Sequence, residues 1–129
     1  MGLQSLRVLV VEDHGFQRRM ALRMLAELGI ENAWEAADGH AALGVLHGIG
    51  EPPDVVLVDL DMPGMDGVEF IGHLAQRHLA RGVALVSAMD AGLLNAVQAM
   101  ARGYGLAVLG CVEKPLTTAK LRKPSRSSL

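Results

Sequence analysis

The chain has 129 residues, half of them hydrophobic, which suits one domain with a sizeable buried core. A formal net charge of −2 and an aromatic content of 3% give little basis for binding nucleic acid through charge or stacking. The single cysteine, Cys111, excludes an internal disulfide and favours a cytoplasmic protein. The N-terminal apolar run VLVV is too short to span a membrane, so we expect neither a signal peptide nor a membrane segment.

Five short segments predict β-strands. Four are apolar runs rich in Val and Leu, at residues 7–11, 55–58, 83–86 and 106–112. Strands of this composition are covered on both faces, as in a parallel sheet flanked by helices. Residues 32–37 form a weaker and more polar segment, which we expect at an edge of the sheet.

Helical patterns lie between the strands. The first, at residues 16–28, should turn Met20, Met24 and Leu28 inward and stop at Gly29. Further helices are predicted at residues 39–47, 68–79 and 91–104, and a last short one starts near residue 117. Their expected core positions are Ala42, Leu43 and Leu46, then Phe70, Ile71 and Leu74, then Leu94, Val97 and Met100. Residues 123–129 lack apolar periodicity, and we expect them to be a disordered tail or the start of a linker.

Strands and helices therefore alternate along the whole chain. This order predicts an α/β fold with a doubly wound parallel sheet, helices on both faces and right-handed crossovers. In such sheets ligands bind beyond the carboxyl ends of the strands. Polar and charged side chains stand at four of these predicted ends: Glu12 and Asp13, Asp59, Ser87, and Lys114.

Taken singly, these residues have ordinary explanations. An acid or a serine after a strand usually caps the next helix, and a lone lysine is usually solvated. Together, the acids form an oxygen-rich site that suits Mg²⁺, while Ser87 and Lys114 supply a hydroxyl and a positive charge. These are the groups needed to transfer a phosphoryl group to a carboxylate, with Asp59 as the nucleophile. We read the five histidines as surface residues, although His14 lies close enough to line the site.

Four motifs resemble the receiver domain of two-component response regulators. They are VLVVEDH, VLVDLDMPGMDG, VSA and VEKP, and the resemblance covers about residues 6–122 of the chain. It implies a flavodoxin-like fold with strand order 2-1-3-4-5 and a receiver domain at residues 1–122. It also implies that Asp59 takes a phosphoryl group from the phosphohistidine of a sensor histidine kinase or a phosphotransfer protein.

The same resemblance implies roles for the site residues. Ser87 and Lys114 would contact the phosphoryl oxygens, and the Lys114–Pro115 bond would be cis. Mg²⁺ would be held by Glu12, Asp13, Asp59 and the backbone carbonyl of Asp61. The domain would be a signalling module rather than an enzyme, and it would switch conformation to control an output domain elsewhere in the full-length chain.

Two features depart from the usual receiver pattern. Cys111 stands where the family often has Tyr or Phe, so we expect helix 91–104 to shift instead, with Met89 and Met100 repacking. The segment between Ser87 and Lys114 is long and, with VEDHGFQRR, resembles receivers joined to EAL-type cyclic-di-GMP phosphodiesterase outputs. The cognate kinase and a homodimeric state are left open.

Two other interpretations of the site are kept. Asp59-Leu60-Asp61 after an apolar strand resembles the DxD nucleophile of haloacid dehalogenase-type phosphatases, but Pro63 stands where Thr or Val is expected. That family also carries a second pair of acids downstream, which is absent here. The other alternative is a degenerate receiver that acts only as a docking module.

Overall fold

The computed structural model describes residues 5–61, 67–88, 91–114 and 116–122, and its five strands form one parallel sheet. The strand order is β2-β1-β3-β4-β5, which confirms the order expected from the sequence. The strands are β1 (Arg7–Val11), β2 (Asn32–Ala36), β3 (Val55–Asp59), β4 (Gly82–Ser87) and β5 (Ala107–Glu113).

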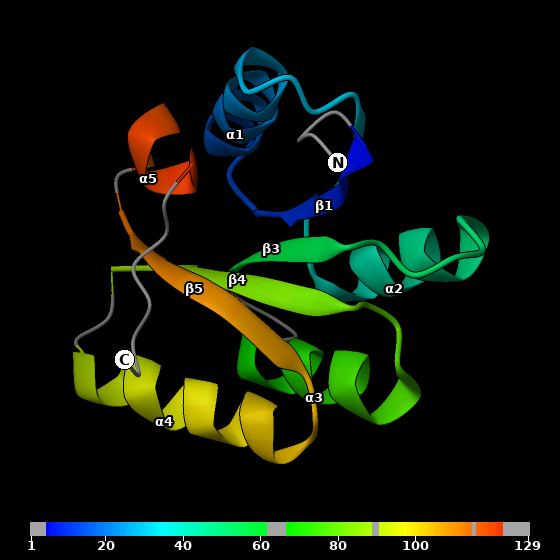
Figure 1. Ribbon diagram of the computed structural model, residues 1–129, viewed down its shortest axis with the longest axis vertical. Coiled ribbons are helices and arrows are strands. Elements are labelled where there is room, and N and C mark those ends of the chain that lie inside the picture. The colour runs from blue at the N-terminus through cyan, green and yellow to red at the C-terminus, as the bar shows by residue number, and fades with distance from the viewer. Residues whose placement is uncertain (1–4, 62–66, 89–90, 115, 123–129) are drawn as a thin grey trace.

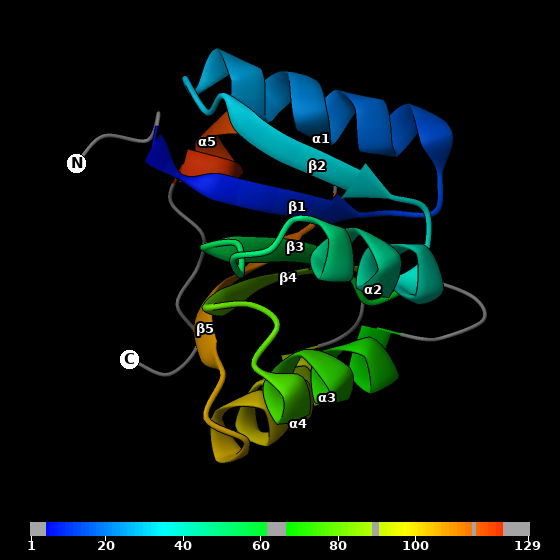
Figure 2. The same ribbon diagram turned by 90° about the vertical axis from the view of Figure 1, so that its right-hand side faces the viewer.

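Helices cover both faces of the sheet (Figures 1 and 2). Helices α1 (Gly15–Glu27) and α5 (Thr118–Arg122) lie on one face, and α2 (Gly39–Gly48), α3 (Gly67–Arg77) and α4 (Ala91–Gly103) lie on the other. None of the described helices is long and apolar enough to cross a membrane. The predicted tail at residues 123–129 and the predicted cis bond before Pro115 lie outside the described residues.

Each central strand contributes to two hydrophobic cores. Along β1, Val8 and Val10 pack toward α1, whereas Leu9 and Val11 pack toward α2 and α3. Successive side chains of a strand point to opposite faces, so a buried strand needs apolar residues at every position. Each such side chain contributes about 1.5–3 kcal/mol when fully buried. This anchoring fixes the strand ends, where the polar side chains stand.

The predicted helix faces are confirmed on one side of the sheet. Phe70, Ile71 and Leu74 of α3 are fully buried, and α2 buries Ala42 and Leu46. Leu94, Val97 and Met100 of α4 also join this core.

The predicted face of α1 is wrong. Its buried residues are Ala21 and Leu25, whereas Met20, Met24 and Leu28 are only partly buried. The helix is rotated by about one residue from the predicted face, so Ala21 and Leu25 pack with Val8 and Val10 of β1 while Met20 and Met24 line a cavity. Gly29 does end the helix as expected, with a φ of 91° that favours glycine.

A β-bulge in β5 sets the register at the site. Val83 pairs with Val108 but Ala84 pairs with Gly110, so Leu109 is the extra residue. The strands re-align beyond the bulge, and Ser87 pairs with Glu113. Lys114, one residue further, is thereby delivered to the edge where β3 and β4 end.

Candidate functional site

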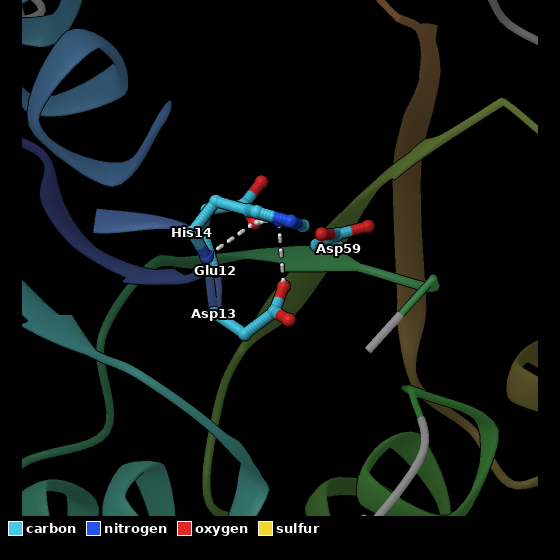
Figure 3. A group of neighbouring side chains, drawn as sticks. All are labelled: Glu12, Asp13, His14 and Asp59. Carbon is cyan, nitrogen blue, oxygen red and sulfur yellow. Dashed lines mark hydrogen bonds and ion pairs between the residues drawn. The ribbon is translucent and has the colours of Figure 1, made fainter. Parts of the chain in front are cut away.

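Acidic side chains from β1 and β3 meet at the carboxyl edge of the sheet (Figure 3). Glu12 and Asp13 follow β1 directly, and Asp59 is the last residue of β3. Asp59 is 2% exposed and Glu12 is 6% exposed. Glu12, Asp13, His14 and Asp59 each offer a donor atom, and these four atoms all lie within 4.8 Å of one another. The predicted convergence of these strand ends is therefore observed.

Lys114 is the counter-charge of this acidic group. Its Nζ lies 3.0 Å from Asp59 Oδ1 and 3.3 Å from Asp61 Oδ2. Burial alone would lower the pKa of Lys114, but Asp59, Asp61 and Glu12 outweigh it and raise the pKa above its ordinary value. The ammonium group is thus charged wherever the acids are ionised.

Asp61 is held on the β4 side of the site. Its carboxylate accepts hydrogen bonds from Ser87 Oγ at 3.1 Å and from the Ala88 backbone N–H at 3.0 Å. Burial would raise the pKa of Asp61, but these two hydrogen bonds and Lys114 lower it overall. The Asp61 backbone N–H in turn donates to Asp59 Oδ1 at 2.9 Å, so Asp61 braces the central acid.

Glu12 carries the strongest electrostatic perturbation at the site. Burial, together with the neighbouring Asp59 and Asp13, raises its pKa to about 7 despite the lowering effect of a hydrogen bond from the His14 backbone. Arg18 of α1 fixes this turn by donating to the Glu12 carbonyl at 2.9 Å and to Glu35 Oε1 at 2.8 Å. The turn therefore holds the acids together despite their repulsion.

Among the residues that the structure describes, two buried carboxylate oxygens have no hydrogen-bond partner, Asp13 Oδ1 and Asp59 Oδ2. Leaving a buried acceptor unsatisfied is costly, and it marks a place for a missing partner. A hard cation with carboxylate and water ligands meets this need, so the residues present fit Mg²⁺. The carboxylate of Asp61 is not in the four-residue group, and the metal role expected for its carbonyl stays a prediction.

The site also opens onto a cavity of about 450 Å³ beside α1. Glu12 and Lys114 line it together with mostly apolar side chains, among them Met20, Met24 and Leu116. The acids are therefore approachable from the α1 face as well as from the strand ends.

A comparison with known families identifies the chain. The family described as "response regulator receiver domain" matches residues 8–125. The chain belongs to this family. Receiver domains are signalling modules, and this membership argues against the haloacid dehalogenase interpretation.

Individual relatives agree with this assignment. This chain is 35% identical over 119 residues to the cyclic di-GMP phosphodiesterase RocR of Pseudomonas aeruginosa. The match covers 92% of this chain but only 30% of RocR. It is 31% identical to the chemotaxis protein CheY-3 of Vibrio cholerae, covering 93% of this chain and 88% of that protein. Among solved structures, a response regulator from Colwellia psychrerythraea matches with a TM-score of 0.75 and 28% identity, covering 90% of each chain.

Sequence reasoning missed three contributions to the site of the receiver domain. They are the side chain of Asp61 as an acceptor for Ser87, the Ala88 backbone N–H, and the brace from Arg18. For His14, the fourth residue of the group with close donor atoms, the one signal in the sequence was its position next to Glu12 and Asp13. The remaining contacts depend on how loops fold back over the strand ends.

Proposed function

We propose that this receiver domain accepts a phosphoryl group on Asp59 from the phosphohistidine of a sensor histidine kinase or phosphotransfer protein. The observation that carries the proposal is the environment of the Asp59 carboxylate. It is almost fully buried, Oδ1 lies 3.0 Å from Lys114 Nζ, and Oδ2 has no hydrogen-bond partner. A carboxylate held in this way is oriented for attack and has a free oxygen.

The transfer exchanges one bond for another. An Asp59 oxygen forms a bond to phosphorus while the P–N bond to the donor histidine breaks, and the electron pair returns to the imidazole. Lys114, already between Asp59 and Asp61, would stabilise the negative charge of the phosphoryl oxygens. Ser87, whose hydroxyl now donates to Asp61, would turn that donation to a phosphoryl oxygen.

Glu12, Asp13 and Asp59 would hold the Mg²⁺, together with the Asp61 carbonyl. The ion would supply positive charge that offsets both the acid repulsion and the incoming phosphoryl group. The chain's own contribution is to keep three acids close to one point, through the anchored ends of β1 and β3. Asp13→Ala should greatly weaken Mg²⁺ binding in isothermal titration, because it removes a ligand.

Phosphorylation would be relayed through α4. Loss of the Ser87–Asp61 hydrogen bond would release the start of the loop that leads into α4. Gln98 of α4 is almost fully buried and donates to Cys111 Sγ, which ties the helix to β5. Beryllofluoride, a phosphoryl mimic, should change the protection of backbone amides from hydrogen exchange at residues 88–104. Met89, which we expect to repack, lies outside the described residues.

The output would belong to another part of a longer, cytoplasmic protein. The similarity to RocR favours a cyclic di-GMP phosphodiesterase output, since this chain spans 30% of that relative. We assign no nucleic-acid or membrane contact to this domain, and a homodimer is open to test by sedimentation.

Mass spectrometry after treatment with acetyl phosphate and Mg²⁺ tests the proposal. Wild type should gain one phosphoryl group, and Asp59→Asn should gain none. Asp38→Asn is a matched control, because Asp38 caps α2 through its side chain and Asn caps equally well. An undiminished adduct in Asp59→Asn would refute the assignment. The absence of any adduct in wild type would favour the degenerate docking module.

A further inference from the structure

The imidazole of His14 faces the same point as the acids (Figure 3). His14 Nδ1 lies 3.2 Å from Asp13 Oδ1 and 3.3 Å from Glu12 Oε2. Although His14 takes the N-cap position of α1, its side chain makes no capping hydrogen bond. The ring is thus turned toward the acidic group rather than toward the helix end.

Hydrogen bonding alone does not account for this arrangement. A single Nδ1–H can point at one oxygen, yet two carboxylate oxygens lie at nearly equal distances from the nitrogen. Asp13 Oδ1 has no hydrogen-bond partner even so, and neither has Oδ2 of the buried Asp59. Donors on one tetrahedral Zn²⁺ with bonds of about 2.0–2.1 Å lie about 3.3–3.4 Å apart. The distances from His14 Nδ1 to Asp13 Oδ1 and Glu12 Oε2, 3.2 Å and 3.3 Å, are close to that separation.

We propose that His14 Nδ1 is a fourth side-chain donor of the metal site, and that it increases the preference of the site for transition ions such as Zn²⁺ over Mg²⁺. The inference rests on the metal site of the proposed function and adds a ligand to it. Four donors from Glu12, Asp13, His14 and Asp59 match the number that Zn²⁺ takes in closed protein sites.

The chemistry of the donor explains the selectivity. Mg²⁺ prefers carboxylate, carbonyl and water oxygens, whereas imidazole suits Zn²⁺ and its neighbours in the transition series. A site made only of oxygen donors already binds Zn²⁺ somewhat more tightly than Mg²⁺. The contribution of His14 is therefore the change in the ratio of Zn²⁺ affinity to Mg²⁺ affinity when the imidazole is removed. His14 is largely exposed, so its ring can adjust to an ion without disturbing the core.

Isothermal titration of wild type and His14→Gln with Zn²⁺ and with Mg²⁺ measures that ratio. Gln preserves a polar side chain but removes the nitrogen donor. We expect His14→Gln to weaken Zn²⁺ binding by about tenfold or more and Mg²⁺ binding by less than about threefold. His40→Gln, at an exposed position on α2, is the matched control for non-specific histidine binding and should leave both affinities unchanged.

Nitrogen-15 NMR of the histidine rings supplies a readout on the unmutated protein. One equivalent of Zn²⁺ should shift the Nδ1 resonance that disappears in His14→Gln, and it should leave the other rings unaffected. Equal losses of Zn²⁺ and Mg²⁺ affinity in His14→Gln, or an unshifted His14 ring, would overturn the inference.

The same preparations distinguish this inference from the proposed function. If Asp59 is phosphorylated with Mg²⁺ while His14 does not respond to Zn²⁺, only the role of His14 is wrong. If His14 does not respond to Zn²⁺ and wild type also gains no phosphoryl group, both the role of His14 and the proposed function are wrong.

Discussion

Replacing Glu12 by Gln should stabilise the metal-free protein in a strongly pH-dependent way. The pKa of Glu12 rises from its ordinary 4.5 to about 7 in the folded chain, first because of burial and then because of Asp59 and Asp13. Between these two values the folded protein binds more protons than the unfolded chain, so its stability falls as the pH rises. Gln cannot ionise and escapes this loss.

The magnitude follows from the shift. Each pKa unit corresponds to about 1.4 kcal/mol, so the full effect is about 3 kcal/mol and is reached above pH 7. At pH 5 the folded carboxyl is protonated and the loss is about 1 kcal/mol. The stability gap between Glu12→Gln and wild type should therefore widen by about 2 kcal/mol from pH 5 to pH 8.

Urea denaturation in EDTA at pH 5 and pH 8 measures this gap. Glu31→Gln, at an exposed position before β2, is the control and should show no widening. Mg²⁺ should restore wild-type stability at pH 8 far more than at pH 5, because the metal needs an ionised ligand. Parallel pH profiles for wild type and Glu12→Gln would show that burial and the neighbouring acids do not raise the pKa of Glu12.

Three further substitutions test the packing around the site. A Cβ at Gly67 would lie 2.8 Å from Leu60 Cα, so Gly67→Ala should destabilise the fold by about 1–3 kcal/mol in thermal unfolding. Gly72→Ala meets open space on the same helix and should instead stabilise it by about 0.5–1 kcal/mol; the opposite order of the two melting temperatures would contradict this reading. Gln98→Ala should cost about 1–3 kcal/mol in urea unfolding and speed alkylation of Cys111, since it removes a buried donor and opens the thiol; an unchanged alkylation rate would show that the contact does not protect it.

The sheet and its strand ends could be predicted from the sequence because they depend on local patterns. Runs such as VLVVED place an apolar strand directly before an acid, and parallel strands bring their carboxyl ends to one edge. Asp59, Ser87 and Lys114 therefore meet as expected.

The rotation of α1 could not be predicted in the same way. Met20 and Met24 share the four-residue spacing of Ala21 and Leu25, so both pairs satisfy an inward face. The choice depends on which pair fits against the side chains of the sheet, and in the folded chain Ala21 and Leu25 pack with Val8 and Val10. Periodicity along α1 does not contain this information about β1.

The side-chain partners at the site could not be predicted from the sequence either. Asp61 follows the end of β3, and its carboxylate turns toward β4, where Ser87 Oγ and the Ala88 N–H are available. This orientation is decided by donors from a strand that is remote in the sequence. The motif alone indicated only its backbone carbonyl, by resemblance.

The energetics of the site tie its stability to its function. Clustering Glu12, Asp13 and Asp59 raises the free energy of the folded state, and Lys114 compensates only on the side of Asp59 Oδ1. The uncompensated side contains the two oxygens without hydrogen-bond partners. A cation that binds there makes the interaction that these oxygens lack in the metal-free chain, so the local instability contributes to metal affinity. Substitutions that relieve the repulsion should therefore stabilise the domain and weaken its metal binding together, because both effects come from the same charges.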